Sequence, residues 1–144
     1  MRFTHEGEVS EPEGWLLMEG QVSAPPGSGV DAPLPRRLTF MIDTGATHCV
    51  VEQQLLTGLG PVVGDAPMRT LAGSDERHVY RVGVSLFMSD ASRALRPVGI
   101  DLRVIATEPR PESVPFQGVI GLDFLRRCRL VLDGPGRTFS LAID

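Results

Sequence analysis

Apolar residues alternate with polar ones along several short segments of the chain, which is the period of two typical of half-buried β-strands. In residues 36–43, the apolar side chains of Leu38, Phe40 and Ile42 occupy every second position. The same alternation predicts strands at residues 79–88 and 98–106, and short β-rich runs between turn residues predict strands at residues 15–22, 130–133 and 138–143. The last two flank Gly134-Pro135-Gly136 and are predicted to form a hairpin.

Turn-forming residues separate these segments, because the chain contains 16 Gly and 12 Pro. Residues 122–128 have helical character, since Asp123 near the start and Arg126 and Arg127 near the end suit the helix dipole. Residues 50–56 are predicted to be a short helix or a turn. We therefore expect an all-β domain with one short C-terminal helix.

The length and net charge of the chain exclude some classes of function. The 144 residues, 42% of them hydrophobic, suffice for one globular domain with its own core. The net charge is −4 and no basic stripe is present, so a nucleic-acid partner is not expected. No segment approaches the ~20 apolar residues of a membrane span, and residues 1–14 do not resemble a signal peptide. We expect no membrane association and a cytoplasmic location.

The chain contains only two cysteines and three histidines. Cys49 and Cys128 lie among apolar residues and form no Cys-x-x-Cys motif, so both are interpreted as small core residues. His5, His48 and His78 lie far apart and lack metal-ligand spacing. We therefore expect no metal site and no cofactor.

The most informative segment is LTFMIDTGA, residues 38–46, in which a predicted strand ends in a carboxylate. Its simplest interpretation is a strand followed by a tight turn. The residues also suit acid–base chemistry, because Gly45 lets a backbone N–H approach the Asp43 carboxylate and Thr44 adds a hydroxyl. Peptide hydrolysis requires both a base and an acid, and two carboxylates that share one proton supply both.

A second carboxylate with the same surroundings is missing from the sequence, since no other Asp-Thr/Ser-Gly is present. The second carboxylate must then come from another copy of the chain. A two-fold dimer pairs a residue near the axis with itself, so Asp43 would face Asp43. We therefore expect the chain to act as a homodimer.

Two segments carry a family resemblance. LTFMIDTGATHCVV, residues 38–51, resembles the active-site strand of the retropepsin-like aspartic proteases of retroviruses, retrotransposons and their cellular single-domain relatives. VIGLDFL, residues 119–125, is similar to the second signature of that family. The resemblance implies a retropepsin-like acid protease barrel over residues 15–144, acting as a two-fold homodimer. Residues 1–14 would be an N-terminal segment and a candidate strand at the dimer interface.

The resemblance also implies roles for single residues. Asp43 would be the catalytic carboxylate, Thr44 would hydrogen-bond across the dimer axis, and Gly45 would orient the carboxylate and contact substrate. Gly121 would let its loop pass close behind the active-site strand. The residues expected to bind substrate are Ala46 and the flap residues Leu71, Ala72, Gly73 and Ser74.

The flap is expected at residues 69–80, RTLAGSDERHVY, as a hairpin that closes over the substrate. Viral flap tips are rich in glycine, whereas this one carries Asp75, Glu76 and Arg77. Three interpretations of these charges are open: they favour an open flap, they contact a charged substrate, or they belong to a solvated turn. We prefer the solvated turn.

The favoured function is an aspartic endopeptidase that cleaves peptide or protein substrates. The alternative is a catalytically silent module of the same fold that dimerises or binds peptides, since fold does not imply function. Metal-dependent hydrolysis through Asp43 and His48 is disfavoured, because no third ligand lies at a recognisable spacing.

Overall fold

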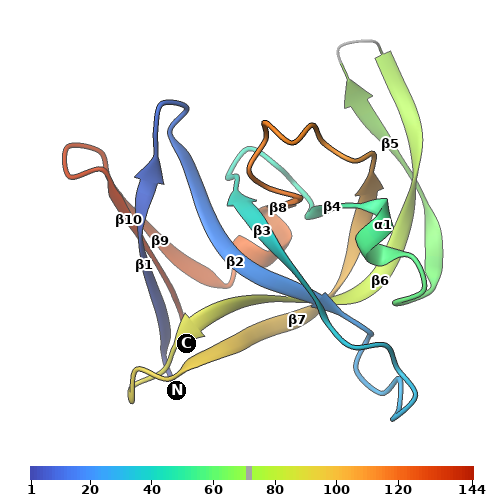
Figure 1. Ribbon diagram of the computed structural model, residues 1–144, viewed down its shortest axis with the longest axis horizontal. Coiled ribbons are helices and arrows are strands. Elements are labelled where there is room, and N and C mark those ends of the chain that lie inside the picture. The colour runs from blue at the N-terminus through green and yellow to red at the C-terminus, as the bar shows by residue number, and fades with distance from the viewer. Residues whose placement is uncertain (71–72) are drawn as a thin grey trace.

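The computed structural model describes residues 1–70 and 73–144, which form ten β-strands and two short helices (Figure 1). In chain order, the elements are β1 (Phe3–Ser10), β2 (Trp15–Ser23), β3 (Arg36–Ile42), β4 (Val50–Glu52), α1 (Gln53–Leu56), β5 (Val62–Thr70), β6 (Gly73–Ser89), β7 (Leu95–Thr107), β8 (Gly118–Ile120), α2 (Leu122–Leu125), β9 (Cys128–Asp133) and β10 (Thr138–Ile143). The prediction of an all-β fold is confirmed.

The strands form one continuous sheet in the order β5-β6-β7-β4-β8-β3-β2-β1-β10-β9. The long strand β6 also pairs with β2, where Gly20 lies opposite Leu86 and Val22 opposite Val84. This additional pairing joins β6, β7, β4, β8, β3 and β2 into a ring, and the ribbon curls around a central space accordingly (Figure 1). The apolar core is built from buried residues of these strands together with Phe124 and Leu125 of α2 and Phe139 and Leu141 of β10.

The alternating pattern of residues 36–42 is reproduced in the structure. Leu38, Phe40 and Ile42 are buried, whereas Thr39 and Met41 on the opposite face are partly exposed. The Phe40 ring is held between neighbouring strands that carry glycine at the points of contact, since a Cβ on Gly20 or on Gly118 would lie 2.7 Å from it. Burying alternate residues of β3 fixes its register and therefore the position at which the strand ends.

Strand β8 lies between β3 and β4, which are consecutive along the chain. It runs parallel to β3, with Ile42 opposite Ile120, and antiparallel to β4, with Val50 opposite Val119. The connection from β3 to β4 therefore passes around the end of β8. This arrangement places residues 43–49 against the segment that follows β8.

Residues 1–14, expected to be an interface strand, contain β1, which pairs along residues 3–8 with β10 of the same chain. β10 pairs in turn with β9, so β1, β10 and β9 form a terminal sheet in which β9 is an edge strand. Val131 and Leu132 of this edge are 52% and 59% exposed.

The expectation of a single short helix is incomplete, because residues 50–56 divide into β4 and a second short helix, α1. The predicted helix at residues 122–128 is also shorter than expected, since α2 ends at Leu125 and β9 begins at Cys128. Extended pairing with β10 competes with helix at these residues and prevails. Both cysteines are free thiols, with Cys49 buried and Cys128 half-buried.

Candidate active site

Asp43 lies directly after the end of β3, at the point where the two sequence signatures meet. Its backbone N–H donates to the carbonyl of Ile120 at 3.0 Å, which extends the parallel pairing of β3 with β8 by one residue. The Asp-Thr-Gly segment and the Val-Ile-Gly segment are 78 positions apart (121 minus 43) in the sequence and adjacent in space. The Asp43 side chain is half-buried in this position.

The turn after β3 orients the carboxylate of Asp43. The backbone N–H of Gly45 donates to Asp43 Oδ1 at 2.8 Å, and the N–H of Ala46 donates to the Asp43 carbonyl at 3.2 Å. A Cβ on Gly45 would lie 3.2 Å from Oδ1, which is a tight contact. The second oxygen, Oδ2, accepts no hydrogen bond from the described residues. One oxygen is therefore fixed by the backbone while the other is left to accept a proton or a water molecule.

Thr44 and Ala46 flank this turn. Thr44 is exposed, and its hydroxyl has no hydrogen-bond partner within the described part of the chain. Ala46 is half-buried, and its carbonyl accepts the N–H of Leu122 at 2.8 Å. The roles expected for these two residues, bracing across an axis and contacting substrate, remain predictions.

The segment that starts at Gly121 supports the turn from behind. A Cβ on Gly121 would lie 2.6 Å from the carbonyl oxygen of His48 and 2.8 Å from that of Ala46. Asp123 donates its backbone N–H to the carbonyl of Thr47 at 3.2 Å. Glycine is therefore required at position 121, because the backbone of residues 46–48 lies too close to leave room for a side chain.

Asp123 is a supporting residue that the sequence analysis did not identify. Its carboxylate accepts the backbone N–H of Cys49 at 3.1 Å, the Cys49 thiol at 3.1 Å and the N–H of Phe124 at 2.9 Å. Burial raises the pKa of the Cys49 thiol, and the nearby Asp123 charge raises it further, so the thiol remains protonated and able to donate. Only the folded chain brings these residues together, because they are 74 positions apart.

A hairpin, formed by β5 and β6, lies where the flap was expected, and its role as a flap remains a prediction. Arg69 pairs with Ser74, and the hairpin extends at the end of the molecule toward which β3 also runs (Figure 1). Gly73 has a φ of +130°, a conformation that favours glycine, and Ser74 is exposed. Leu71 and Ala72, which we expected to contact substrate, lie outside the described residues.

The interpretation of the flap charges as a solvated turn is wrong, because all three residues lie in strand β6 and pair with β5, although two of them are solvent-exposed as expected. Asp75 and Glu76 are exposed, but the Arg77 side chain is only 19% exposed. Arg77 Nη1 lies 3.2 Å from Glu108 Oε1, and Nη2 lies 3.4 Å from Asp75 Oδ2. The guanidinium therefore connects the hairpin to the loop that follows β7.

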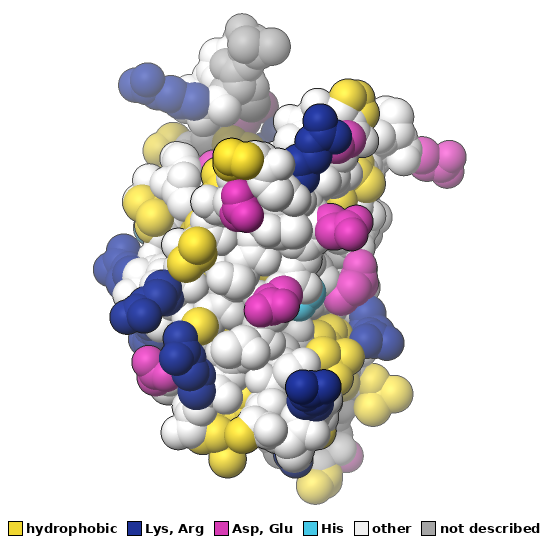
Figure 2. Space-filling view, turned by 90° about the vertical axis from the view of Figure 1, so that its left-hand side faces the viewer, with side chains coloured by type: hydrophobic (Ala, Val, Ile, Leu, Met, Phe, Trp, Pro, Cys, Tyr) yellow, Lys and Arg dark blue, Asp and Glu magenta, His cyan; other side chains and the backbone are white. Residues whose placement is uncertain are grey.

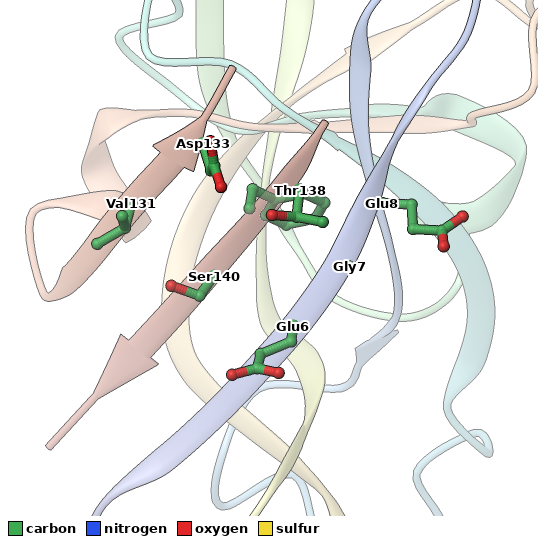
Figure 3. Close-up of a pocket in the computed structure, with 8 residues that line it drawn as sticks. Glu6, Gly7, Glu8, Val131, Asp133, Thr138 and Ser140 are labelled. Atoms are coloured by element: carbon green, nitrogen blue, oxygen red, sulfur yellow. The ribbon is translucent and has the colours of Figure 1, made fainter. Parts of the chain in front are cut away.

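A hollow of about 400 Å³ lies elsewhere, on the terminal sheet, and its lining includes Glu6 and Glu8 of β1 and Asp133 of β9 (Figure 3). Figure 2, which views the molecule from the left-hand side of Figure 1, shows acidic side chains spread over that side. No residue of the turn after β3 lines this hollow. Asp43 is the better candidate for chemistry, because its carboxylate combines backbone orientation with a free oxygen.

A scan of the chain against models of known protein families found no match, and neither did a search of curated proteins. No helix within residues 1–70 and 73–144 has the length and apolar character that a membrane span requires. The same residues contain no group of three His, Cys, Asp or Glu side chains arranged to hold a metal ion.

Proposed function

We propose that the chain is one half of an aspartic endopeptidase, with Asp43 as the catalytic carboxylate of each subunit. The observation that carries the proposal is the state of the Asp43 side chain. Oδ1 accepts the Gly45 N–H at 2.8 Å, while Oδ2 accepts nothing from the described residues. A carboxylate held in this way is oriented by one oxygen and keeps the other oxygen available to accept a hydrogen bond.

Two such carboxylates provide the acid and the base that amide hydrolysis requires. One Asp43 would remove a proton from a water molecule held between the pair, and the water oxygen would attack the scissile carbonyl. The partner subunit's Asp43, protonated because two adjacent carboxylates cannot both ionise, would donate its proton to the carbonyl oxygen. The tetrahedral intermediate would collapse as the departing amine gains a proton, without a covalent enzyme intermediate.

The proposal requires a dimer, because the chain contains one Asp-Thr-Gly. An edge suited to a second copy is β9, which pairs only with β10 and carries the exposed apolar residues Val131 and Leu132. An unpaired strand edge with apolar side chains is a template for pairing with another chain. Two copies of β9 related by a two-fold axis would join the terminal sheets of both subunits, and the proposal requires that the same axis pass beside Asp43, because the two carboxylates must share one proton.

The substrate would be a peptide in an extended conformation. Exposed strand edges and hairpins bind such peptides through main-chain hydrogen bonds, and a flap excludes water while it is closed. The β5–β6 hairpin supports this part of the proposal, because its strands pair from Val62 and Tyr80 to Thr70 and Gly73, next to the expected flap tip.

The test is cleavage of a reduced, unfolded protein between about pH 4 and pH 7, where a carboxylate pair that shares one proton is half-ionised. We expect cleavage by the parent chain and a loss of about 10²-fold or more in Asp43→Asn, since acid–base groups contribute that much to the rate. The matched control is Asp90→Asn, which alters another carboxylate that accepts the backbone N–H two residues later, from Ser92 at 2.9 Å, and lies outside the proposed dimer edge.

Equal cleavage by the parent and by Asp43→Asn would contradict the proposal. A folded dimer that cleaves nothing across this pH range would instead favour the binding module. A chain that remains monomeric at high concentration would also count against the enzyme, because a single chain supplies one Asp43.

A further inference from the structure

A hollow of about 350 Å³ adjoins the segment that follows the Asp43 turn. It is lined by His48, Arg81, Asp101, Leu102, Arg103 and Asp123. Its walls come from β6, β7, α2 and the loop between β3 and β4. No step of the proposed hydrolysis uses these side chains.

Two arginines lie side by side on the sheet face that lines this hollow. Arg81 of β6 and Arg103 of β7 are directly opposed in the antiparallel register, so their side chains emerge on the same face of the sheet. Like charges in directly opposed positions are destabilising unless an anion lies between or beside them. Asp101, two residues before Arg103, lies on that face and accepts Arg81 Nη2 at 2.7 Å and Arg81 Nε at 3.1 Å. Both of these hydrogen bonds to Asp101 therefore come from Arg81.

Arg103 is left with no ion pair within the described part of the chain, and its side chain is exposed. The other acid of the hollow, Asp123, is occupied by the backbone N–H groups of Cys49 and Phe124. His48 Nδ1 lies 4.0 Å from Asp123 Oδ2, at the outer limit of an ion pair, and the imidazole is 59% exposed. The hollow thus presents a free guanidinium beside an accessible imidazole, with both of its acids already engaged.

We propose that this hollow binds the carboxylate of an aspartate or glutamate side chain in the peptide substrate, with Arg103 as the main donor. The planar guanidinium matches a carboxylate with two parallel hydrogen bonds, and the added negative charge would relieve the repulsion between Arg81 and Arg103. The proposal rests on the proposed endopeptidase activity and specifies its substrate preference.

The position of the hollow limits where the acidic side chain lies in the substrate. His48 follows Asp43 by five residues, so the Cα atoms of Asp43 and of this lining residue lie at most ~17 Å apart. An extended peptide advances ~3.3 Å per residue. The acidic residue would therefore lie several residues from the scissile bond at most, rather than in a remote part of the substrate.

The test uses a library of mixed-sequence decapeptides, with cleavage sites read by mass spectrometry for the parent, Arg103→Glu and Arg93→Glu. We expect the parent to prefer an acidic residue at one fixed distance from the cleavage site by about tenfold, the strength of one charge-assisted hydrogen bond. Arg103→Glu should lose this preference and favour Arg or Lys at the same distance. Arg93→Glu makes the same charge change in the β6–β7 turn, outside the hollow, and should retain the parental preference.

The outcomes separate the two proposals. Cleavage by the parent without an acidic preference, or a preference unchanged in Arg103→Glu, overturns this inference and leaves the endopeptidase intact. Failure of the folded parent to cleave any peptide overturns the endopeptidase and this inference with it. Circular dichroism of the variants checks that the exposed substitutions leave the fold unchanged.

Discussion

Two turns of this molecule use the same local device and differ in what surrounds it. In the turn after β3, Gly45 donates its N–H to Asp43 Oδ1 at 2.8 Å. In the turn between β6 and β7, Ser92 donates its N–H to Asp90 Oδ1 at 2.9 Å. Both are an aspartate that accepts the backbone N–H two residues later, a pattern common in turns.

The two carboxylates differ in their remaining partners. Asp90 also accepts the Ser92 hydroxyl at 2.6 Å and Arg96 Nε at 2.7 Å, and together with the backbone N–H groups of Ala94 and Ser92 these bonds lower the pKa of Asp90 to about 2. Asp43 accepts one bond, and its Oδ2 has no donor among the described residues. Asp90 is a structural turn residue, whereas Asp43 retains the capacity to bind something else.

The support behind each turn also differs. The Asp90 turn is held by its own hairpin, through Asp90 N–H to Ala94 and Arg93 N–H to Asp90. The Asp43 turn is held by a distant segment, which donates from Leu122 to the carbonyl of Ala46. Because the distant segment holds the Asp43 turn, the Asp43 carboxylate does not need to fill all its hydrogen-bonding positions to stabilise that turn. Substitutions that weaken the contacts behind each turn test this difference.

The largest expected effect comes from Gly121→Ala, because the added Cβ would meet the carbonyl oxygens of His48 and Ala46. We expect a loss of about 1–3 kcal/mol in the free energy of unfolding, as for overpacking. Cleavage should fall by about 10²-fold, because the Asp43 turn would shift. Denaturant unfolding and peptide cleavage measure both. Gly134→Ala, where a Cβ meets nothing within 4 Å, should be close to neutral, and equal losses in both variants would refute this role for Gly121.

Removing the Asp123 carboxylate should have the next largest effect. Asp123→Ala leaves the N–H of the buried Cys49 without its acceptor, which costs about 1–3 kcal/mol of unfolding free energy. Asp123→Asn keeps one acceptor oxygen and should lose less. If thermal unfolding shows the two variants to be equally stable, the carboxylate does not hold the loop.

Acid unfolding tests the role of the Asp90 carboxylate. Because the pKa of Asp90 is lowered from 3.8 to about 2, the ionised side chain stabilises the fold fully above pH 3.8. This contribution is lost as the pH falls from 3.8 toward 2. Asp90→Asn should be less stable than the parent at pH 6 and should show a smaller loss over that acid range, as measured by thermal unfolding. A loss of stability in Asp90→Asn over this acid range as large as that of the parent would contradict this role for Asp90.

The smallest expected effect concerns His5, which packs against Phe139 with ring centroids 5.7 Å apart. Burial lowers the pKa of His5 below 6.5, although the neighbouring Glu6 partly opposes this shift. Neutral His5 therefore stabilises the fold above pH 6.5, and this contribution is lost as the pH falls below that value. His5→Gln should flatten the stability profile slightly between pH 5 and 7, and an unchanged slope would show that His5 does not contribute.

Much of the fold could be predicted from local sequence. The alternation at Leu38, Phe40 and Ile42 predicted β3 and its buried face, and the glycines around position 134 predicted the final hairpin. Local sequence could not predict that β6 also pairs with β2, or that β8 lies between β3 and β4. Those pairings join residues far apart in the chain, and periodicity carries no information about them.

The residues of the candidate site could likewise be predicted only where their interactions are local in the sequence. Asp43 and Gly45 could be identified because their chemistry is local, a carboxylate followed two residues later by the N–H that binds it. Asp123 and Arg77 could not, since their partners lie 74 and 31 positions away, at Cys49 and Glu108. A charged side chain looks the same in the sequence whether it faces water or a distant segment.

The central claim is that each active site requires Asp43 from two chains, and mixing subunits tests it most directly. Parent and Asp43→Asn chains are unfolded together in equal amounts, refolded, and assayed for peptide cleavage at fixed total concentration. If the site needs two copies of Asp43, only about a quarter of the dimers are active, and cleavage falls to about a quarter of the all-parent value. Cleavage at about half of the all-parent value would show that each chain acts alone and would contradict the account.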